Sequence, residues 1–247
     1  SNSFNLLDLL KNASNIYIVG GDKIIQENYD VLHKIAINNS YDRYLYQYRD
    51  GRPIPISYFW QILNCLKIKS DDSGLQALKL TSKNGKTRTL FDINFLNSSA
   101  FLKILGYITA EGTICENCVM ISNLDTEFLK DASDAFSNLA IQCFYGNRGI
   151  ISGSRVFVEI IKVLCGKEKS GRKKVPGFIF NLEKEKIAQF LSAYFEGDGG
   201  VEKNRSLITA VSKSKRLISE ITYLLYYFGI IGRISKTKKE PANCGWK

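Results

Sequence analysis

Two short segments place a carboxylate next to small residues at the end of an apolar run. Each has two small residues four positions apart, and the second is followed by an acid and a glycine: Gly106, Ala110, Glu111 and Gly112, then Ala193, Gly197, Asp198 and Gly199. Two carboxylates brought close repel each other unless a proton or a cation lies between them. Their oxygens suit a hard cation such as Mg²⁺, which can stabilise charge on a phosphate and activate water. The pattern therefore indicates a metal-assisted hydrolytic centre.

The small residues predict two helices that pack closely side by side. Positions i and i+4 lie on one helix face, and glycine or alanine there lets two backbones approach. The glycine after each acid predicts that the helix ends there, so Glu111 and Asp198 would meet at the two helix ends. The small pairs and the acids share one offset (193 − 106 = 87 and 198 − 111 = 87). This shared offset indicates an internal duplication with two pseudo-symmetric halves.

Residues 104–112 and 191–199 resemble the LAGLIDADG motifs of homing endonucleases, in the single-chain, two-motif form that is often found inside inteins. The resemblance covers about residues 98–240 and excludes the N-terminal third. It implies an α+β fold in which an αββαββα unit is used twice, in halves at residues 98–175 and 176–247. In each half, a twisted antiparallel sheet would straddle the DNA.

The resemblance implies a monomer that hydrolyses both strands of DNA at a long, asymmetric target site. Mg²⁺ is the expected cofactor, with Mn²⁺ as a substitute. Glu111 and Asp198 match the motif acids and would be both catalytic residues and metal ligands. Gly112 and Gly199 follow them as further metal ligands.

A catalytic lysine is also expected near the metal, on the strand that follows each motif helix. Lys213 holds this place in the second half, but the first half has Asn123 or Leu124 there. We therefore take Lys174 as the candidate for the first half. The alternative for Lys213 is a surface lysine that contacts phosphate.

A second class of function stays open, namely a nucleic-acid-binding protein that does not cleave. An RNA-splicing maturase or a transcription regulator with this fold would be an example. The two acids argue against it, because a pure binder has no need of paired carboxylates, whereas Leu124 mildly favours it.

The chain of 247 residues carries a formal charge of +10, from 34 basic and 24 acidic residues, which suits double-stranded DNA as partner. Basic residues in loops and strands would contact phosphates independently of sequence, although such residues are often simply solvated. The candidates are Arg148, Arg155, Lys167, Lys169, Arg172, Lys173, Arg205, Arg233, Lys236 and Lys238.

Residues 1–95 precede the duplicated part, which occupies residues 96–247. Apolar spacing predicts helices at residues 24–37, 41–49 and 58–66, which together resemble a helix-turn-helix module. Residues 75–91 alternate around Asn84-Gly85 and predict a β-hairpin with a type I′ turn. We thus expect a mainly helical region with one hairpin, and a plain helical subdomain is as good an explanation as DNA reading.

The second half is predicted to contain a strand at 207–212, a helix at 215–228 and another strand beginning at 229–235. Only 49 residues follow Asp198 (247 − 198), against 87 between the two acids. The final strand and helix of this half are therefore expected to be missing, either because the domain is shortened or because the sequence was cut from a longer one.

Several other features exclude classes of protein. Cys115 and Cys118 form a CxxC pair, which alone is not a zinc site and reads as a structural pair or a disulfide. Self-splicing is not expected, because Ala242 stands where the helping histidine should. No apolar run is long enough for a membrane span, and an intracellular protein associated with the nucleoid is expected.

Overall fold

The computed structural model describes residues 6–38, 42–69, 72–82, 90–93, 95–166, 170–202 and 207–236. Residues 6–93 contain a four-stranded antiparallel sheet in the order β2-β1-β3-β4. The strands are β1 (Ile16–Val19), β2 (Ile54–Pro55), β3 (Lys79–Ser82) and β4 (Phe91–Asp92). Helices make up more of this region than strands do, as predicted, whereas β1 and β2 were not predicted, because they are too short to give a clear alternating pattern.

The helices of this region largely follow the apolar spacing of the sequence. The predicted helix at 24–37 is split at Asn28, and the other two predictions are confirmed to within a few residues. The helices are α1 (Leu6–Leu10), α2 (Asp22–Glu27), α3 (Tyr29–Asn38), α4 (Asp42–Arg49) and α5 (Ile56–Cys65). Strand β3 pairs antiparallel with β4, as the predicted hairpin requires, but Leu80 lies opposite Phe91, whereas an uninterrupted hairpin with a two-residue turn at Asn84-Gly85 would place it opposite residue 89. The turn itself, at residues 83–89, lies outside the described residues.

The next unit begins with α6 (Ser99–Glu111), the first motif helix. Its first turn is capped by the Ser98 hydroxyl, which accepts from the Phe101 N–H at 3.2 Å. A four-stranded antiparallel sheet follows, in the order β5-β6-β8-β7, with helices α7 and α8. These elements are β5 (Gly112–Ile114), β6 (Val119–Ser122), α7 (Thr126–Asn138), β7 (Phe144–Gly146), β8 (Gly149–Ser152) and α8 (Arg155–Cys165).

A second unit repeats the first part of this order. It comprises α9 (Lys184–Asp198), β9 (Gly199–Glu202), β10 (Leu207–Ala210) and α10 (Lys215–Tyr226). Strands β9 and β10 pair with each other, with Gly199 opposite Ala210, much as Gly112 lies opposite Ile121. α10 is capped by the Ser214 hydroxyl and α7 by the Asp125 carboxylate.

The strand predicted at 229–235 does not form, and residues 230–236 have no regular structure. The first unit explains why. There, β7 pairs only with β8 and never with the central strand β6. In the order of elements, the segment after α10 corresponds to β7. The described residues of the second unit contain no strand that corresponds to β8, so this segment has no strand to pair with.

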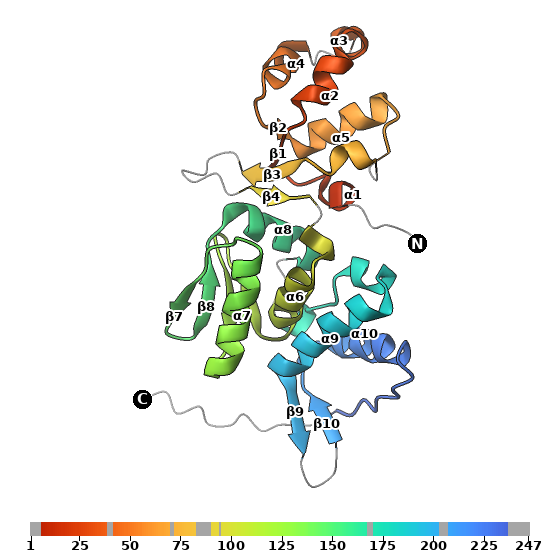
Figure 1. Cartoon of the computed structure of the whole chain (residues 1–247). Helices are drawn as coiled ribbons and strands as arrows, with labels where there is room; N and C mark the ends of the chain where they lie inside the picture. The colour runs from red at the N-terminus through yellow and green to blue at the C-terminus, as the bar shows by residue number, and fades with distance from the viewer. Residues whose placement is uncertain are drawn as a thin grey trace.

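Figure 1 shows helices α2, α3 and α4 at one end of the molecule and the β9–β10 hairpin at the other, with the N-terminal sheet between these helices and α8. α1 and β3 contact α8, so the N-terminal region rests on the first unit. Helices α6 and α9 lie side by side and make the most extensive contact between any two elements. Among the fully buried side chains of the core are Phe101, Tyr107, Phe190 and Tyr194 from these two helices.

Candidate active site

The two motif helices touch through small residues that contact each other reciprocally. A Cβ atom added to Gly106 of α6 would lie 2.7 Å from the Cβ of Ala193 of α9. A Cβ added to Gly197 of α9 would lie 2.8 Å from the Cβ of Ala110 of α6. Each glycine thus faces the alanine of the other helix, and the close approach predicted from the sequence is present.

The glycines that follow the acids act differently from the prediction. Gly112 (φ −78°, ψ 144°) and Gly199 (φ −86°, ψ 150°) are extended and not left-handed. They are required for space, because an added Cβ would lie 2.3 Å from the Ile108 carbonyl oxygen and 2.0 Å from that of Phe195. Strands β5 and β9 can therefore begin directly after Glu111 and Asp198, which fixes both acids at the junction of helix and strand.

The two carboxylates lie close enough to influence each other. Burial, followed by the charge of Glu111, raises the pKa of Asp198 to about 6. Burial also raises the pKa of Glu111. Both acids end a helix, where the negative end of the helix dipole further disfavours a carboxylate. The site therefore concentrates negative charge that a cation would relieve.

Lys173 supplies one positive charge at this point. Its Nζ donates to the carbonyl oxygens of Ala110 at 2.7 Å and Thr109 at 3.2 Å, in the last turn of α6. Burial lowers the pKa of Lys173, whereas the charges of Asp198 and Glu111 raise it. The ammonium group thus caps the helix that carries Glu111 and lies within electrostatic reach of both acids.

This placement was not apparent in the sequence. Lys173 was expected to contact DNA, and Lys174 was the expected catalytic residue. Three consecutive basic residues, Arg172 to Lys174, gave no signal of which one points inwards. Lys173 and Lys174 are both partly buried, and Lys173 is distinguished by its hydrogen bonds to α6. Lys213 is exposed just before α10. The catalytic roles of Lys174 and Lys213 stay predictions.

The predicted DNA-contacting residues are dispersed. Arg148 is exposed at the β7–β8 turn and Arg172 is exposed between the two units. Arg233 and Lys236 are exposed in the segment after α10. The remaining four candidates lie outside the described residues, namely Lys167, Lys169, Arg205 and Lys238.

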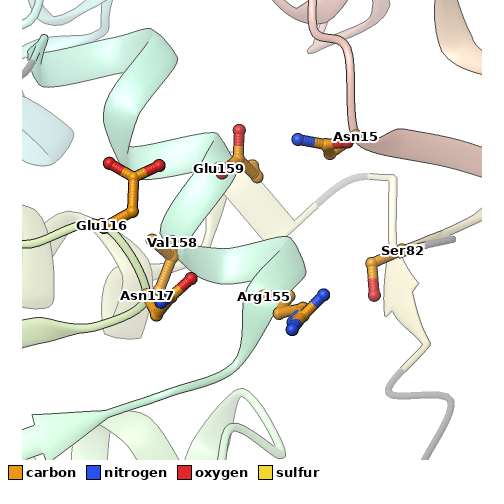
Figure 2. A pocket seen from close by; sticks show the side chains of 7 residues that line it. All are labelled: Asn15, Ser82, Glu116, Asn117, Arg155, Val158 and Glu159. Carbon is orange, nitrogen blue, oxygen red and sulfur yellow. The ribbon is translucent and has the colours of Figure 1, made fainter. Parts of the chain in front are cut away.

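Arg155 is also exposed, and it lines a cavity of about 160 Å³ between the N-terminal region and the first unit. Figure 2 shows its lining, which comes from the start of β1, the end of β3, the β5–β6 turn and α8. Asn15 and Ser82 face Arg155 and Glu159 across it. The cavity contains neither motif acid, so it is separate from the candidate active site.

A polar cluster ties the motif helices together one turn before the acids. The Tyr107 hydroxyl of α6 donates to the Asp131 carboxylate of α7 and lies 2.8 Å from Oε2 of Glu196 of α9. Lys103 donates to the same Asp131 at 2.6 Å. Burial, then hydrogen bonds to both carboxylates, raises the pKa of Tyr107. Glu196 therefore has a hydrogen-bonding partner across the helix interface.

The tyrosines of the two motifs obey the same offset (194 − 107 = 87) but have different surroundings. The Tyr194 hydroxyl is buried without a hydrogen-bond partner in the described part of the chain. We expect Tyr107→Phe to lower the free energy of unfolding by about 1–3 kcal/mol, because hydrogen bonds to charged groups are lost. Urea denaturation measures this loss. Tyr194→Phe is the matched control and should leave stability unchanged or raise it, because it removes a buried hydroxyl that has no partner in the described residues. An equal loss of stability in both variants would show that the hydrogen bonds of Tyr107 contribute nothing.

The raised pKa of Asp198 also predicts how stability depends on pH. Its folded value is about 6 and its ordinary value is 3.8, so the folded state holds the proton more tightly. The free energy of unfolding should therefore fall as the pH rises from about 4 to about 6, by about 1–2 kcal/mol after screening by solvent. Denaturation at pH 4.5 and pH 7.5 tests this. Asp198→Asn should flatten the profile, and a wild-type profile that rises over this window would contradict the prediction.

Oxygen atoms dominate this site. In the described ranges, no group of three or more His, Cys, Asp or Glu side chains could hold a metal by itself. Any ion at the helix ends would have to draw on Glu111, Asp198 and backbone carbonyls. None of the helices described is both long and apolar enough to cross a membrane.

Residues 185–246 match a family model described as a LAGLIDADG-like domain. The matched range contains most of α9, the acid Asp198, the β9–β10 hairpin and α10. The match supports a LAGLIDADG-type domain in this part of the chain.

Relatives of several kinds match a larger part of the chain than the family model does. The chain is 31% identical over 188 residues (72% of the chain) to the DNA polymerase II large subunit of Thermococcus kodakarensis. It is 31% identical over 144 residues (55%) to the RNA polymerase subunit Rpo1C of Methanocaldococcus jannaschii. It is 26% identical over 151 residues (58%) to the glutamine–fructose-6-phosphate aminotransferase of the same organism. The aligned parts span only 10%, 16% and 14% of these relatives.

Proposed function

We propose that this chain is a site-specific endonuclease that hydrolyses both strands of DNA at a centre formed by Glu111, Asp198 and Lys173. The observation that carries the proposal is the reciprocal contact of glycine and alanine between α6 and α9. This contact brings together two acids that repel each other at two helix ends. A protein that only binds nucleic acid gains nothing from such a costly arrangement.

The residues at the helix ends fit a hard divalent cation. Two partly buried carboxylates with raised pKa values form an oxygen donor set that Mg²⁺ prefers. Glu111 and Asp198 would hold the ion, with the carbonyls of Gly112 and Gly199 as further ligands. When bound, Mg²⁺ or Mn²⁺ would polarise the scissile phosphate and make an attacking water more acidic.

The other contributions to cleavage would come from side chains and helices of the protein itself. Lys173, held on the last carbonyls of α6, keeps a cation beside the acids and can offset charge that develops on the phosphate. The close helix contact keeps the two carboxylates at a fixed separation. Since only one lysine lies within reach of the two acids in the described residues, the centre is asymmetric.

The relatives support a particular origin for the chain. Their names give three unrelated activities, yet each shares the same kind of segment, which occupies a small fraction of its length. A segment common to otherwise unrelated proteins is expected of an element inserted in frame. We therefore propose that the chain is the endonuclease part of an intein, that it acts as a monomer with two pseudo-symmetric halves and that it works at the nucleoid.

The proposal is tested by selecting cleaved sites from a library of randomised plasmids incubated with the protein and Mg²⁺. Linear products with a common, long recognition sequence at their ends are expected. The same library with Ca²⁺ should be bound and not cut. Binding in a gel shift without nicking or cleavage in Mg²⁺ or Mn²⁺ would overturn the proposal and favour a DNA-binding or RNA-binding regulator.

A further inference from the structure

A pair of cysteines faces each other across the turn between β5 and β6. Only Glu116 and Asn117 separate Cys115 from Cys118. The Cys115 N–H donates to the Cys118 carbonyl at 2.8 Å, which continues the register of β5 and β6 by one more pair. Cα atoms of such a hydrogen-bonded pair lie about 5.5 Å apart, which is within the range that a disulfide spans.

The turn is held in place by α8. The Lys162 ammonium group donates to the Glu116 carbonyl at 2.6 Å and to the Glu159 carboxylate at 2.8 Å. The Lys162 side chain is only 8% exposed, whereas the Glu116 side chain that it reaches is open to solvent. Because the turn is fixed at its centre, the two thiols are kept opposite each other.

The surroundings exclude other roles for the pair. Two thiols are half of the four ligands that a structural zinc site needs. No third metal-binding side chain joins them in the described ranges. The one histidine of the sequence is His33, on α3 in the N-terminal region, so no imidazole lies beside the pair to activate a catalytic thiol. Thiol–disulfide exchange is the chemistry that remains.

The two thiols are not equivalent. Cys115 is exposed, whereas Cys118 is partly buried. Burial and the neighbouring Cys115 thiol raise the pKa of Cys118. A reagent from solution therefore meets Cys115 first, and Cys118 is placed to resolve the product.

We propose that Cys115 and Cys118 form a dithiol site that a low-molecular-weight disulfide oxidises to an intramolecular disulfide. The Cys115 thiolate attacks one sulfur of the reagent, which forms a mixed disulfide and releases one thiolate. Cys118 loses its proton to solvent and attacks the Cys115 sulfur, which displaces the second thiolate. Both released thiolates take up protons, so two protein thiols are oxidised and one reagent disulfide is reduced.

The disulfide would close the tip of the hairpin whose first strand begins directly after Glu111. It would link β5 to β6 covalently at the point where Lys162 already anchors the turn. The site is independent of the proposed cleavage of DNA, because neither cysteine belongs to the candidate active site.

The test uses glutathione disulfide on the whole, fully reduced chain, followed by alkylation and mass spectrometry of the peptide that contains the turn. We expect this peptide to lose two hydrogen atoms and to carry neither glutathione nor alkyl label. Cys65 is exposed and serves as an internal control. Ring closure is intramolecular, so half oxidation of the pair should need about tenfold less glutathione disulfide than half modification of Cys65.

Variants complete the test. Cys118→Ser should stop at a glutathione adduct on Cys115, whereas Cys65→Ser should leave the intramolecular disulfide unchanged. The proposal is overturned if the wild-type chain accumulates the same Cys115 adduct as Cys118→Ser. It is equally overturned if both cysteines are alkylated under conditions that modify Cys65.

Discussion

Asp198→Asn is expected to lower the single-turnover rate of DNA cleavage by about a thousandfold, which corresponds to about 4 kcal/mol of lost transition-state stabilisation. Asparagine keeps the shape of the side chain and removes the charge that would hold the metal. The affinity for the selected target should stay the same or rise at constant salt, because one negative charge facing the phosphates is lost. The rate of cleavage is measured with plasmid that carries the selected site.

The same variant should be more stable than the wild type at pH 7.5. Burial and the charge of Glu111 disfavour the ionised Asp198, and the neutral amide escapes both costs. A substitution that raises stability while it removes activity is the signature of a functional residue. Glu185→Gln, an exposed isosteric change in the first turn of the same helix, is the control. It should leave cleavage unchanged and should lower stability by no more than about 1 kcal/mol, because an acid in the first turn favours the helix dipole. If Asp198→Asn cleaves the plasmid at the wild-type rate, Asp198 is not a catalytic residue.

Gly106→Ala is expected to lower the free energy of unfolding by about 3 kcal/mol or more. The new Cβ would lie 2.5 Å from the Phe190 carbonyl oxygen as well as 2.7 Å from the Ala193 Cβ. A backbone atom cannot move aside as a flexible side chain can, so α6 and α9 would have to separate. Denaturation with urea at constant pH measures the loss.

Two further variants show whether the loss comes from this contact. Gly177→Ala introduces the same methyl group where nothing lies within 4 Å, so it should change stability by less than about 1 kcal/mol. Ala193→Gly added to Gly106→Ala removes one clash and leaves the one with Phe190, so it should restore only part of the stability. A midpoint for Gly106→Ala equal to that of the wild type would mean that the helices are not in close contact.

The packing of the two motif helices at the centre of the molecule could be predicted from the sequence. Small residues four positions apart have few causes other than the close approach of two backbones, and α6 and α9 do approach closely, although the pairing of each glycine with the alanine of the other helix was not predicted. The acids at the same offset then had to meet. Periodicity likewise predicted a helix at 215–228, within two residues of the observed ends of α10.

Features that depend on distant parts of the chain could not be predicted. The segment at 229–235 has the β-branched residues of a strand, but a strand also needs a partner, and local composition carries no information about it. The burial of Lys173 depends on the path of the segment between the two units. The cluster around Tyr107 joins three helices, and its only trace in the sequence is the shared position of Tyr107 and Tyr194.

The segment between the two units has a consequence for anyone who builds chimeras from related proteins. Its Lys173 side chain caps α6, its Lys173 carbonyl accepts from the Ser214 hydroxyl at 2.6 Å, and its Val175 N–H donates to Glu220 at 2.7 Å. The segment is therefore matched on one side to the helix before it and on the other to α10. A crossover placed within it would separate Lys173 from either α6 or α10. A chimera that exchanges the two halves should take residues 170–176 from the same parent as α6. It should also keep a serine at position 214 and a glutamate at position 220, which contact this segment.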